Sequence, residues 1–160
     1  MGDDETWLRQ AVELATANVA AGGGPFGAVV VRKGEVVTTG VNRVTRDLDP
    51  SAHAEVTAIR TACREIGDFS LAGLVLYSSC EPCPMCLATA LWARLDRVVY
   101  AADRDDAAVA GFDDRAFYDL FGDATAGDRT GWPTQVAQLQ IASATEPFDA
   151  WLAKADRVDY

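Results

Sequence analysis

An apolar strand pattern followed by a helix and a second strand constrains the fold of this chain more than any other feature. Residues 74–79, LVLYSS, read as a continuous strand of the kind that lies in a sheet with helices on its faces. Residues 84–95, PMCLATALWARL, then predict a helix, and residues 97–102, RVVYAA, predict another strand. Strands that alternate with helices in this way indicate an α/β domain.

Two segments upstream supply a helix and a hairpin. Residues 5–20 have helical spacing. The apolar stripe of this segment consists of Leu8, Val12, Ala15 and Val19. Residues 26–42, FGAVVVRKGEVVTTGVN, predict two short strands that turn at Lys33 and Gly34. The N-terminal part is therefore expected to add one helix and two strands.

A second long helix is expected over residues 49–67, DPSAHAEVTAIRTACREIG, where Ser51 can cap the helix and Gly67 can end it. The rest of the chain is less regular. Residues 105–122 read as helix or turn, residues 123–133 as a flexible connector, and residues 145–155 as a short amphipathic helix. The 160 residues suit one domain. We expect a three-layer α/β/α sandwich with a mixed sheet.

The charge of the chain argues against several classes of partner. The net charge is −10, with 14 basic and 24 acidic residues, and Arg and Lys are scattered singly. Proteins that grip a phosphate backbone normally carry a basic patch. We therefore expect no nucleic acid and no anionic membrane as partner, but a small neutral ligand. No apolar run is long enough to span a bilayer, and the start MGDDETW is acidic, so we expect the cytoplasm.

Three of the four cysteines lie in SSCEPCPMC, residues 78–86, and this clustering favours metal chemistry over disulfides. Cys83 and Cys86 lie at a predicted helix start, where their spacing puts both sulfurs on one face. The helix N-terminus carries partial positive charge, which favours thiolates. His53, the only histidine, lies at the start of the preceding helix. These three side chains are the candidate metal ligands.

Three kinds of metal site compete for these residues. An iron–sulfur cluster needs about four thiolates, and the only further candidate, Cys63, lies inside the preceding helix. A closed structural zinc site needs four ligands, and a second cysteine knuckle is missing. His53 with two cysteines gives three ligands and leaves a fourth position for water, as in catalytic zinc sites. This third interpretation leaves Cys80 as a packing residue near the thiolates.

Glu55 follows His53 by two residues. From there it can reach a metal-bound water without binding the metal, and a carboxylate so placed can move a proton between water and substrate. Taken without its neighbours, Glu55 would read as a solvated residue on a helix surface.

The combination of HAE, residues 53–55, with PCPMC, residues 82–86, matches the H-x-E and P-C-x-x-C signature of zinc-dependent nucleobase deaminases. The wider stretches SAHAEVTAIRTAC and LYSSCEPCPMCLATALWA resemble bacterial guanine deaminases of the cytidine deaminase fold, and this resemblance implies a three-layer α/β/α sandwich with a mixed five-stranded sheet. AGFDD, residues 110–114, is more specific to guanine and guanosine deaminases than the zinc motif is. With GGPFGAVVV and ASATEPFDAW the likeness covers most of the chain, and it departs in the connector TAGDRTGWP and the extreme tail.

The resemblance implies a zinc cofactor and its catalytic groups. His53, Cys83 and Cys86 would bind Zn²⁺, and Glu55 would shuttle protons. Glu81, inside the zinc motif, would handle the leaving amine. The implied reaction is the hydrolytic deamination of guanine to xanthine and ammonia.

The resemblance also implies a substrate pocket. Phe26 would stack on the purine ring, and Asn42, helped by the backbone N–H of Ala54, would hold the substrate carbonyl. Asp114 would accept hydrogen bonds from the purine edge. Each of these residues has a plainer interpretation: Phe26 as core packing and Asn42 as a turn residue after a strand. Without the family likeness, Asp114 would be interpreted as a solvent-facing cap.

The resemblance further implies that the C-terminal segment, about residues 130–160, crosses to a partner subunit in a homodimer. This would bring Glu146 and Tyr160 to the neighbour's pocket. Guanosine, ammeline and cytosine remain rival substrates with the same zinc chemistry, although cytosine gives no reason for AGFDD. From a different class, the chain would be a non-catalytic zinc-stabilised binding module, and the presence of Glu55 beside three ligands is the feature against that.

Overall fold

The computed structural model describes residues 2–124, with side chains placed over residues 4–122. The connector beyond residue 124, the expected tail helix and the expected exchanged segment lie outside the described residues. Within residues 2–124, no helix is both long and apolar enough to cross a membrane.

Four strands form one mixed sheet in the order β2-β1-β3-β4. The strands are β1 (Gly27–Arg32), β2 (Glu35–Val41), β3 (Val75–Cys80) and β4 (Arg97–Ala102). β1 is antiparallel to both β2 and β3, whereas β3 and β4 are parallel. The mixed sheet is confirmed, but residues 2–124 form four strands and not five. The reason is that the segment after β4 folds as two helices, so it adds no strand to the β4 edge.

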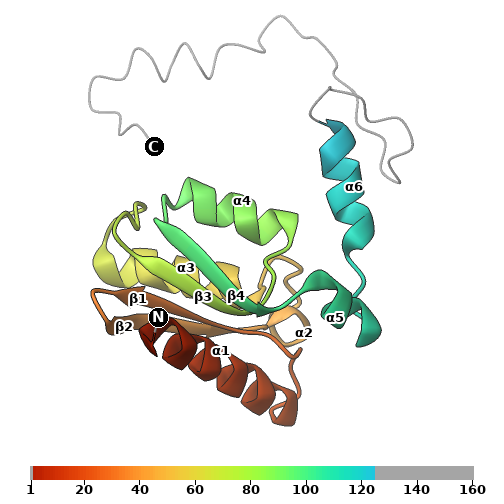
Figure 1. Cartoon of the computed structure of the whole chain (residues 1–160), viewed down its shortest axis with the longest axis horizontal. Helices are drawn as coiled ribbons and strands as arrows, with labels where there is room; N and C mark the ends of the chain where they lie inside the picture. The colour runs from red at the N-terminus through yellow and green to blue at the C-terminus, as the bar shows by residue number, and fades with distance from the viewer. Residues whose placement is uncertain (1, 125–160) are drawn as a thin grey trace, which may run out of the picture. The chain divides into compact units, whose positions relative to one another are not determined.

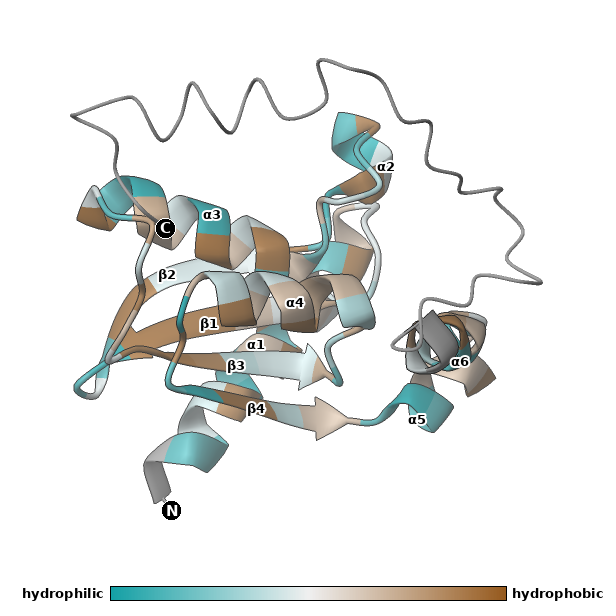
Figure 2. Ribbon diagram, turned by 90° about the horizontal axis from the view of Figure 1, so that it is seen from above, coloured by the Kyte–Doolittle hydropathy of each residue, from teal (hydrophilic) through white to brown (hydrophobic). Residues whose placement is uncertain are grey.

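Helices cover both faces of this sheet (Figure 1). α1 (Gly2–Ala20) lies on one face, and α3 (Ala54–Ile66) and α4 (Pro84–Trp92) lie on the other, as the view from above also shows (Figure 2). The short helix α2 (Val44–Asp47) follows β2, and α5 (Arg104–Val109) and α6 (Arg115–Ala124) follow β4. Gly111, with φ +94°, lies between these last two helices, as expected for a turn.

Strand β1 carries the core on both of its faces because successive side chains alternate. Ala28 and Val30 pack into the cluster on the α3 and α4 side. Val29 and Val31 pack into the cluster under α1. Lys33 and Gly34 both have positive φ, so the β1–β2 hairpin turns where the sequence predicted.

The predicted stripe of α1 is partly wrong. Val12 and Val19 are 42% and 52% exposed, whereas Ala11 and Ala15 are buried. The cause is Gly27 on β1: a Cβ there would lie 2.4 Å from the carbonyl oxygen of Ala11. A strand glycine opposite small helix residues lets α1 approach closely along Ala11 and Ala15, and this turns the helix away from the expected face.

The predicted cap of α3 is also wrong, while its end at Gly67 is confirmed. The N-cap residue is His53, and the Ser51 hydroxyl donates to Asp49 Oδ1 at 2.7 Å instead. This turn at Asp49 delays the helix start by two residues. α3 then packs directly on β2, because a Cβ at Gly40 would lie 2.3 Å from the Ala54 carbonyl oxygen. The start of α3 is thereby fixed against the sheet.

Candidate active site

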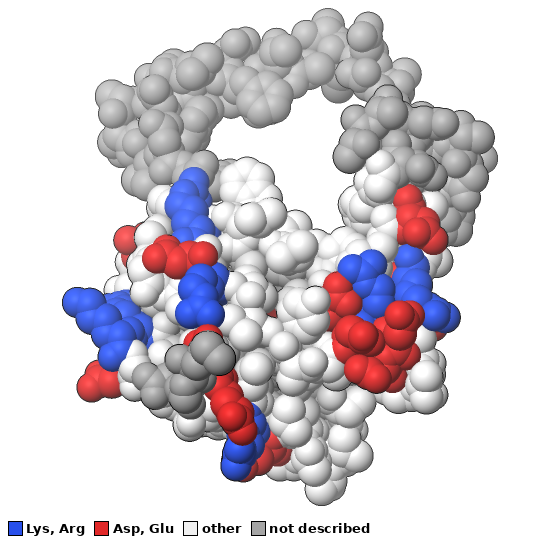
Figure 3. Space-filling model, in the orientation of Figure 1, with Lys and Arg blue, Asp and Glu red and all other residues white. Residues whose placement is uncertain are grey.

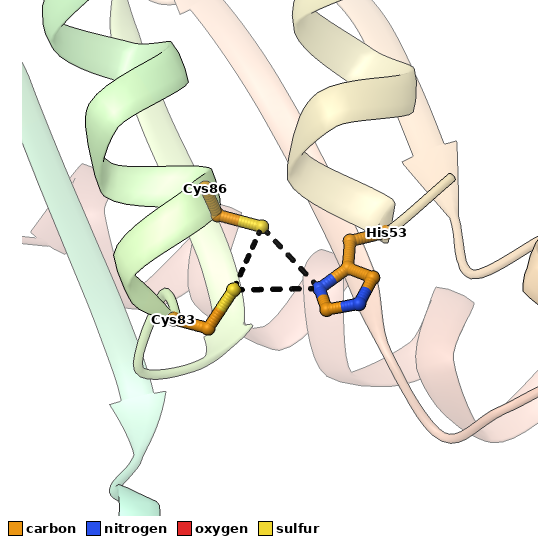
Figure 4. Close-up of side chains that lie close together, drawn as sticks. All are labelled: His53, Cys83 and Cys86. Carbon is orange, nitrogen blue, oxygen red and sulfur yellow. Dashed lines mark hydrogen bonds between the residues drawn. The ribbon is translucent and has the colours of Figure 1, made fainter. Parts of the chain in front are cut away.

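Two helix N-termini meet on one side of the sheet. His53 is the N-cap of α3 and Cys83 is the N-cap of α4, each with extended backbone. Pro84 takes the first helical position of α4, where its missing N–H has no intrahelical partner to lose, and Cys86 follows in the first turn. Figure 4 shows the imidazole and the two thiols pointing toward one another from these helix starts.

The three side chains form a triangle of the size that zinc requires. Cys83 Sγ lies 3.6 Å from Cys86 Sγ and 3.6 Å from His53 Nδ1, and Cys86 Sγ lies 3.4 Å from the same nitrogen. Tetrahedral Zn–S and Zn–N bonds of ordinary length imply edges of about 3.8 Å between sulfurs and about 3.6 Å between sulfur and nitrogen. The donor set and its spacing therefore fit zinc. Within residues 4–122, no other cysteine joins this group.

The protonation states in this cluster favour a cation. The hydrogen bond with Cys86 lowers the pKa of Cys83 to about 4, and His53 acts in the same direction. The hydrogen bond with Cys83 in turn raises the pKa of His53. The neighbouring Cys83 sulfur and burial raise the pKa of Cys86, because a second thiolate beside the first is unfavourable. A bound dication would relieve this repulsion, so metal binding and loss of the second thiol proton are coupled.

Glu55 lies in the first turn of α3 and is 5% exposed. Its Oε1 accepts a hydrogen bond from Ser78 Oγ at 3.2 Å, and its Oε2 lies 3.5 Å from Cys86 Sγ. Burial raises the pKa of its carboxyl group. A carboxyl held beside the metal ligands in this way is suited to taking up and returning a proton.

Cys80 differs from the other two cysteines of SSCEPCPMC. It ends β3, is 8% exposed, and its thiol donates to the Asp103 carbonyl oxygen at 3.7 Å. Burial raises its pKa to about 11, so it remains a neutral thiol. It lies outside the group formed by His53, Cys83 and Cys86.

A cavity of about 610 Å³ opens beside the cluster, within the range of small-molecule sites. It brings together most of the residues expected at the site. Those that line it are Phe26, Asn42, His53, Glu55, Glu81, Cys83 and Asp114. Ala54 is fully buried at the first position of α3, where the backbone N–H has no intrahelical acceptor. Glu146 and Tyr160 lie outside the described residues.

The pocket has an aromatic wall and two polar edges. The rings of Phe26 and Phe112 meet edge to face, with centroids 5.0 Å apart. Asn42 Oδ1 accepts from the Val44 N–H at 3.2 Å, which leaves the Asn42 amide group as the donor available to a ligand. Asp114 is half-buried, and burial raises its pKa.

The carboxylate of Glu81 is held by Arg104. Arg104 donates to it from Nη2 at 2.5 Å, from Nε at 3.0 Å and from its backbone N–H at 3.0 Å. These hydrogen bonds lower the pKa of Glu81. The Arg104 guanidinium also lies 3.6 Å from the centre of the Tyr118 ring, and the Tyr118 hydroxyl donates to the Pro82 carbonyl oxygen at 2.9 Å. The loop before Cys83 is thus tied to α5 and α6.

Sequence reasoning missed three residues of this site. Ser78 lay inside the quoted cysteine motif, and its alternation on a buried strand would have pointed it inward. Phe112 lay inside AGFDD, where an aromatic residue beside two acids was a usable signal. Arg104 had no local signal, because its partner Glu81 is 23 residues away and meets it only through the parallel pairing of β3 and β4.

Charged side chains are mixed on the face drawn in Figure 3. Acidic residues gather over α5, whose first turn holds Asp105 and Asp106. Arg115 is paired there with Asp105 and Asp113. The basic groups of this face therefore stand beside carboxylates, in keeping with the net charge of −10.

Residues 1–102 match the family described as the cytidine and deoxycytidylate deaminase zinc-binding region. The chain belongs to this deaminase family. The match covers the hairpin and both helix starts that carry the ligands, so it explains why the zinc-sized triangle is present.

Relatives within the deaminase family extend the likeness beyond residue 102. Guanine deaminase of Bacillus subtilis is 48% identical over 157 residues, which are 98% of each chain. The X-ray structure of that guanine deaminase superposes with a TM-score of 0.90 over 98% of both chains. A structure of guanine deaminase from Nitrosomonas europaea is 35% identical, with a TM-score of 0.65 over 68% of this chain and 64% of that one. The tRNA-specific adenosine deaminase of Aquifex aeolicus is 32% identical over 80% of this chain and 82% of that protein.

Proposed function

We propose that this protein hydrolyses guanine to xanthine and ammonia, with zinc held by His53, Cys83 and Cys86. The observation that carries the proposal is the 48% identity to a guanine deaminase over 98% of both chains. The pocket supports it, because His53 and Cys83 of the triad, the buried carboxyl group of Glu55, an aromatic wall and the half-buried Asp114 line one cavity. Thiolate ligands need reducing surroundings, so we place the protein in the cytoplasm.

The chemistry divides between the metal and Glu55. When bound, zinc supplies Lewis-acid activation, which lowers the pKa of a coordinated water toward neutrality. Glu55 takes a proton from the attacking water and passes it to the ring nitrogen beside C2. After the water oxygen has added to C2, Glu55 takes the remaining proton of the added hydroxyl group and delivers it to the amino nitrogen. The bond from C2 to that nitrogen breaks as the C2 carbonyl of xanthine forms, and the nitrogen leaves as ammonia. The raised pKa of the buried Glu55 suits this exchange.

The remaining pocket residues hold the purine. Phe26 stacks on the ring, and its edge-to-face contact with Phe112 fixes the plane in which the base lies. The Asn42 amide group and the Ala54 backbone N–H donate to the substrate carbonyl. Asp114 accepts from the N–H groups of the opposite edge, so both edges of the base are read by hydrogen bonds.

Glu81 is proposed to accept a hydrogen bond from the departing ammonia. Its pairing with Arg104 keeps it ionised, so it acts as a fixed acceptor and leaves proton transfer to Glu55. Glu146 and Tyr160 are proposed to complete the pocket from the C-terminal segment of a partner subunit.

A substrate panel with ammonia detection tests the function. Zinc-loaded protein is offered guanine, guanosine, ammeline and cytosine at equal concentration. We expect guanine to be turned over fastest, because the pocket reads both edges of a purine base. If another compound is turned over fastest, that compound and not guanine is the substrate. If none of the four compounds releases ammonia, the enzymatic function is wrong and a zinc-stabilised binding module is favoured.

Substitution of Asp114→Ala is expected to lower kcat/KM for guanine about 10-fold to about 100-fold. Loss of this half-buried acceptor leaves substrate N–H groups unpaired in the occupied pocket, which costs about 1–3 kcal/mol. The substrate panel and a thermal unfolding scan measure the effect. Asp119→Ala, which removes an exposed acid from α6, is the matched control and should retain the parent profile. An unchanged substrate profile in Asp114→Ala would count against a recognition role.

We propose a homodimer with an exchanged C-terminal segment. α4 supports it, since this helix exposes Leu87, Leu91 and Trp92 at 45%, 71% and 65%. An apolar helix face of this kind is typical of an interface. Leu91→Glu should convert the dimer to a monomer of reduced activity in light scattering with size exclusion. Val36→Glu, at an exposed valine on β2, should stay dimeric. A fully active monomer of the parent chain would contradict the proposal.

A further inference from the structure

We infer that Asn18, a buried residue of α1, is a positioning residue that holds the purine-binding residues Phe26 and Asn42 in place. Asn18 is 4% exposed and is not among the residues that line the cavity. Its Nδ2 donates to the carbonyl oxygen of Gly24 at 2.8 Å and to that of Asn42 at 2.9 Å. The inference rests on the proposed function in that guanine is the ligand used to test it.

The chemistry of the amide group fits this position. A side-chain NH₂ has two hydrogens, and two backbone carbonyls from separate segments receive them. A carboxylate at the same position would face two carbonyl oxygens without a proton to offer. Removal of the amide would leave both carbonyls without this donor in a partly buried place, which is costlier than the loss of an exposed hydrogen bond.

The two carbonyls belong to the two segments that carry the purine contacts. Gly24 lies two residues before Phe26, and Asn42 follows the last residue of β2. The two segments are also joined to each other, because the Asn42 N–H donates to the Phe26 carbonyl oxygen at 3.1 Å. Displacement of either segment would therefore move both the stacking ring and the amide that holds the substrate carbonyl.

The loop fits closely around the Asn18 side chain. The Gly23 N–H donates to the Asn18 backbone carbonyl at 2.8 Å. A Cβ at Gly23 would lie 2.4 Å from Asn18 Nδ2, so any larger residue there would push the amide from its two acceptors. Gly23→Ala is therefore a second route to the same effect, without removal of the amide.

The experiment compares Asn18→Ala with Thr38→Val. Like Asn18, Thr38 is buried, lies outside the cavity lining and donates to a backbone carbonyl, that of Ala58 at 3.0 Å. Unlike Gly24 and Asn42, Ala58 does not line the cavity. These two variants and Gly23→Ala are made in zinc-loaded Glu55→Gln protein, and guanine binding is measured by calorimetry. We expect Asn18→Ala and Gly23→Ala to bind guanine about 10-fold more weakly, and Thr38→Val to bind within about 2-fold of its parent.

Coupling to Asn42 separates positioning from general destabilisation. In protein that also carries Asn42→Ala, Asn18→Ala should weaken guanine binding by less than about 3-fold. Part of the effect of Asn18→Ala passes through the Asn42 side-chain amide, which this background lacks. Undiminished loss in that background would overturn the inference. So would parent-like affinity in both Asn18→Ala and Gly23→Ala, or an equal loss in Thr38→Val.

Amide hydrogen exchange in ligand-free protein separates this inference from the proposed function. Asn18→Ala should speed exchange at the Asn42 amide, which the Phe26 carbonyl protects, and Thr38→Val should not. If Asn18→Ala speeds exchange at the Asn42 amide but the parent protein binds no guanine, the proposed function is wrong and the positioning role of Asn18 stands. Unchanged exchange at Asn42 would remove the positioning role even where the parent deaminates guanine.

Discussion

Glu55→Gln is expected to lower kcat for guanine by about 10³-fold while zinc content stays at the parent level. Glutamine has the shape of glutamate, and so it can keep the hydrogen bond from Ser78, but it cannot take up and return a proton. Positioned acid–base groups contribute about 10²-fold to 10⁴-fold to a rate. Ammonia release under saturating guanine measures kcat, and metal analysis of the same sample measures zinc.

The matched control is Glu65→Gln, which neutralises an exposed glutamate on the same helix. It should retain parent kcat, since Glu65 does not line the cavity beside the triad. A rate within about threefold of the parent in Glu55→Gln would remove the proton-transfer role. Loss of zinc from that variant would instead show that the carboxyl group supports the metal site.

The sequence predicted the parts of the site whose chemistry is local. Cys83 and Cys86 are three residues apart at a helix start, and that spacing alone brings both sulfurs to one face. His53 is 30 residues upstream of Cys83, yet it too precedes a predicted helix, and helices on one face of a sheet can bring their N-termini together. The structure confirms this convergence, with all three ligand atoms within 4.8 Å of one another.

The parts that depend on the relative placement of elements were not predictable. Arg104 meets Glu81 because β3 and β4 run parallel and end together, and this needs the strand order. Asn18 meets Asn42 across 24 residues because α1 packs on β1 through the contact at Gly27. Polar partners chosen by packing leave no periodic pattern in the sequence.

Local turn chemistry explains the small errors. Ser51 was a reasonable cap by residue type, but Asp49 accepts both its hydroxyl and its backbone N–H. The helix then begins after His53, so the ligand itself is the N-cap. Both α3 and α4 thus present a metal-ligand side chain at the residue where the helix dipole is positive. The dipoles favour the thiolates and, through them, a bound cation.

Cys83→Ala is expected to abolish both zinc retention and guanine turnover. It removes one of three protein ligands, and structural and catalytic zinc sites rarely hold the metal with two. Because zinc binds the folded state, addition of zinc should raise the melting temperature of metal-free parent protein by several degrees. The same addition should leave Cys83→Ala unchanged, and this readout is independent of activity.

Cys80→Ala is the matched control, since it removes a cysteine three residues earlier in the same motif. This thiol is neutral and donates a hydrogen bond to the Asp103 carbonyl oxygen. Its loss should lower the free energy of unfolding by about 1 kcal/mol, because a small cavity remains. Zinc stoichiometry and the zinc-dependent rise in melting temperature should both persist. Zinc loss from Cys80→Ala together with zinc retention in Cys83→Ala would reverse the ligand assignment. Cys80 would then be a zinc ligand in place of Cys83.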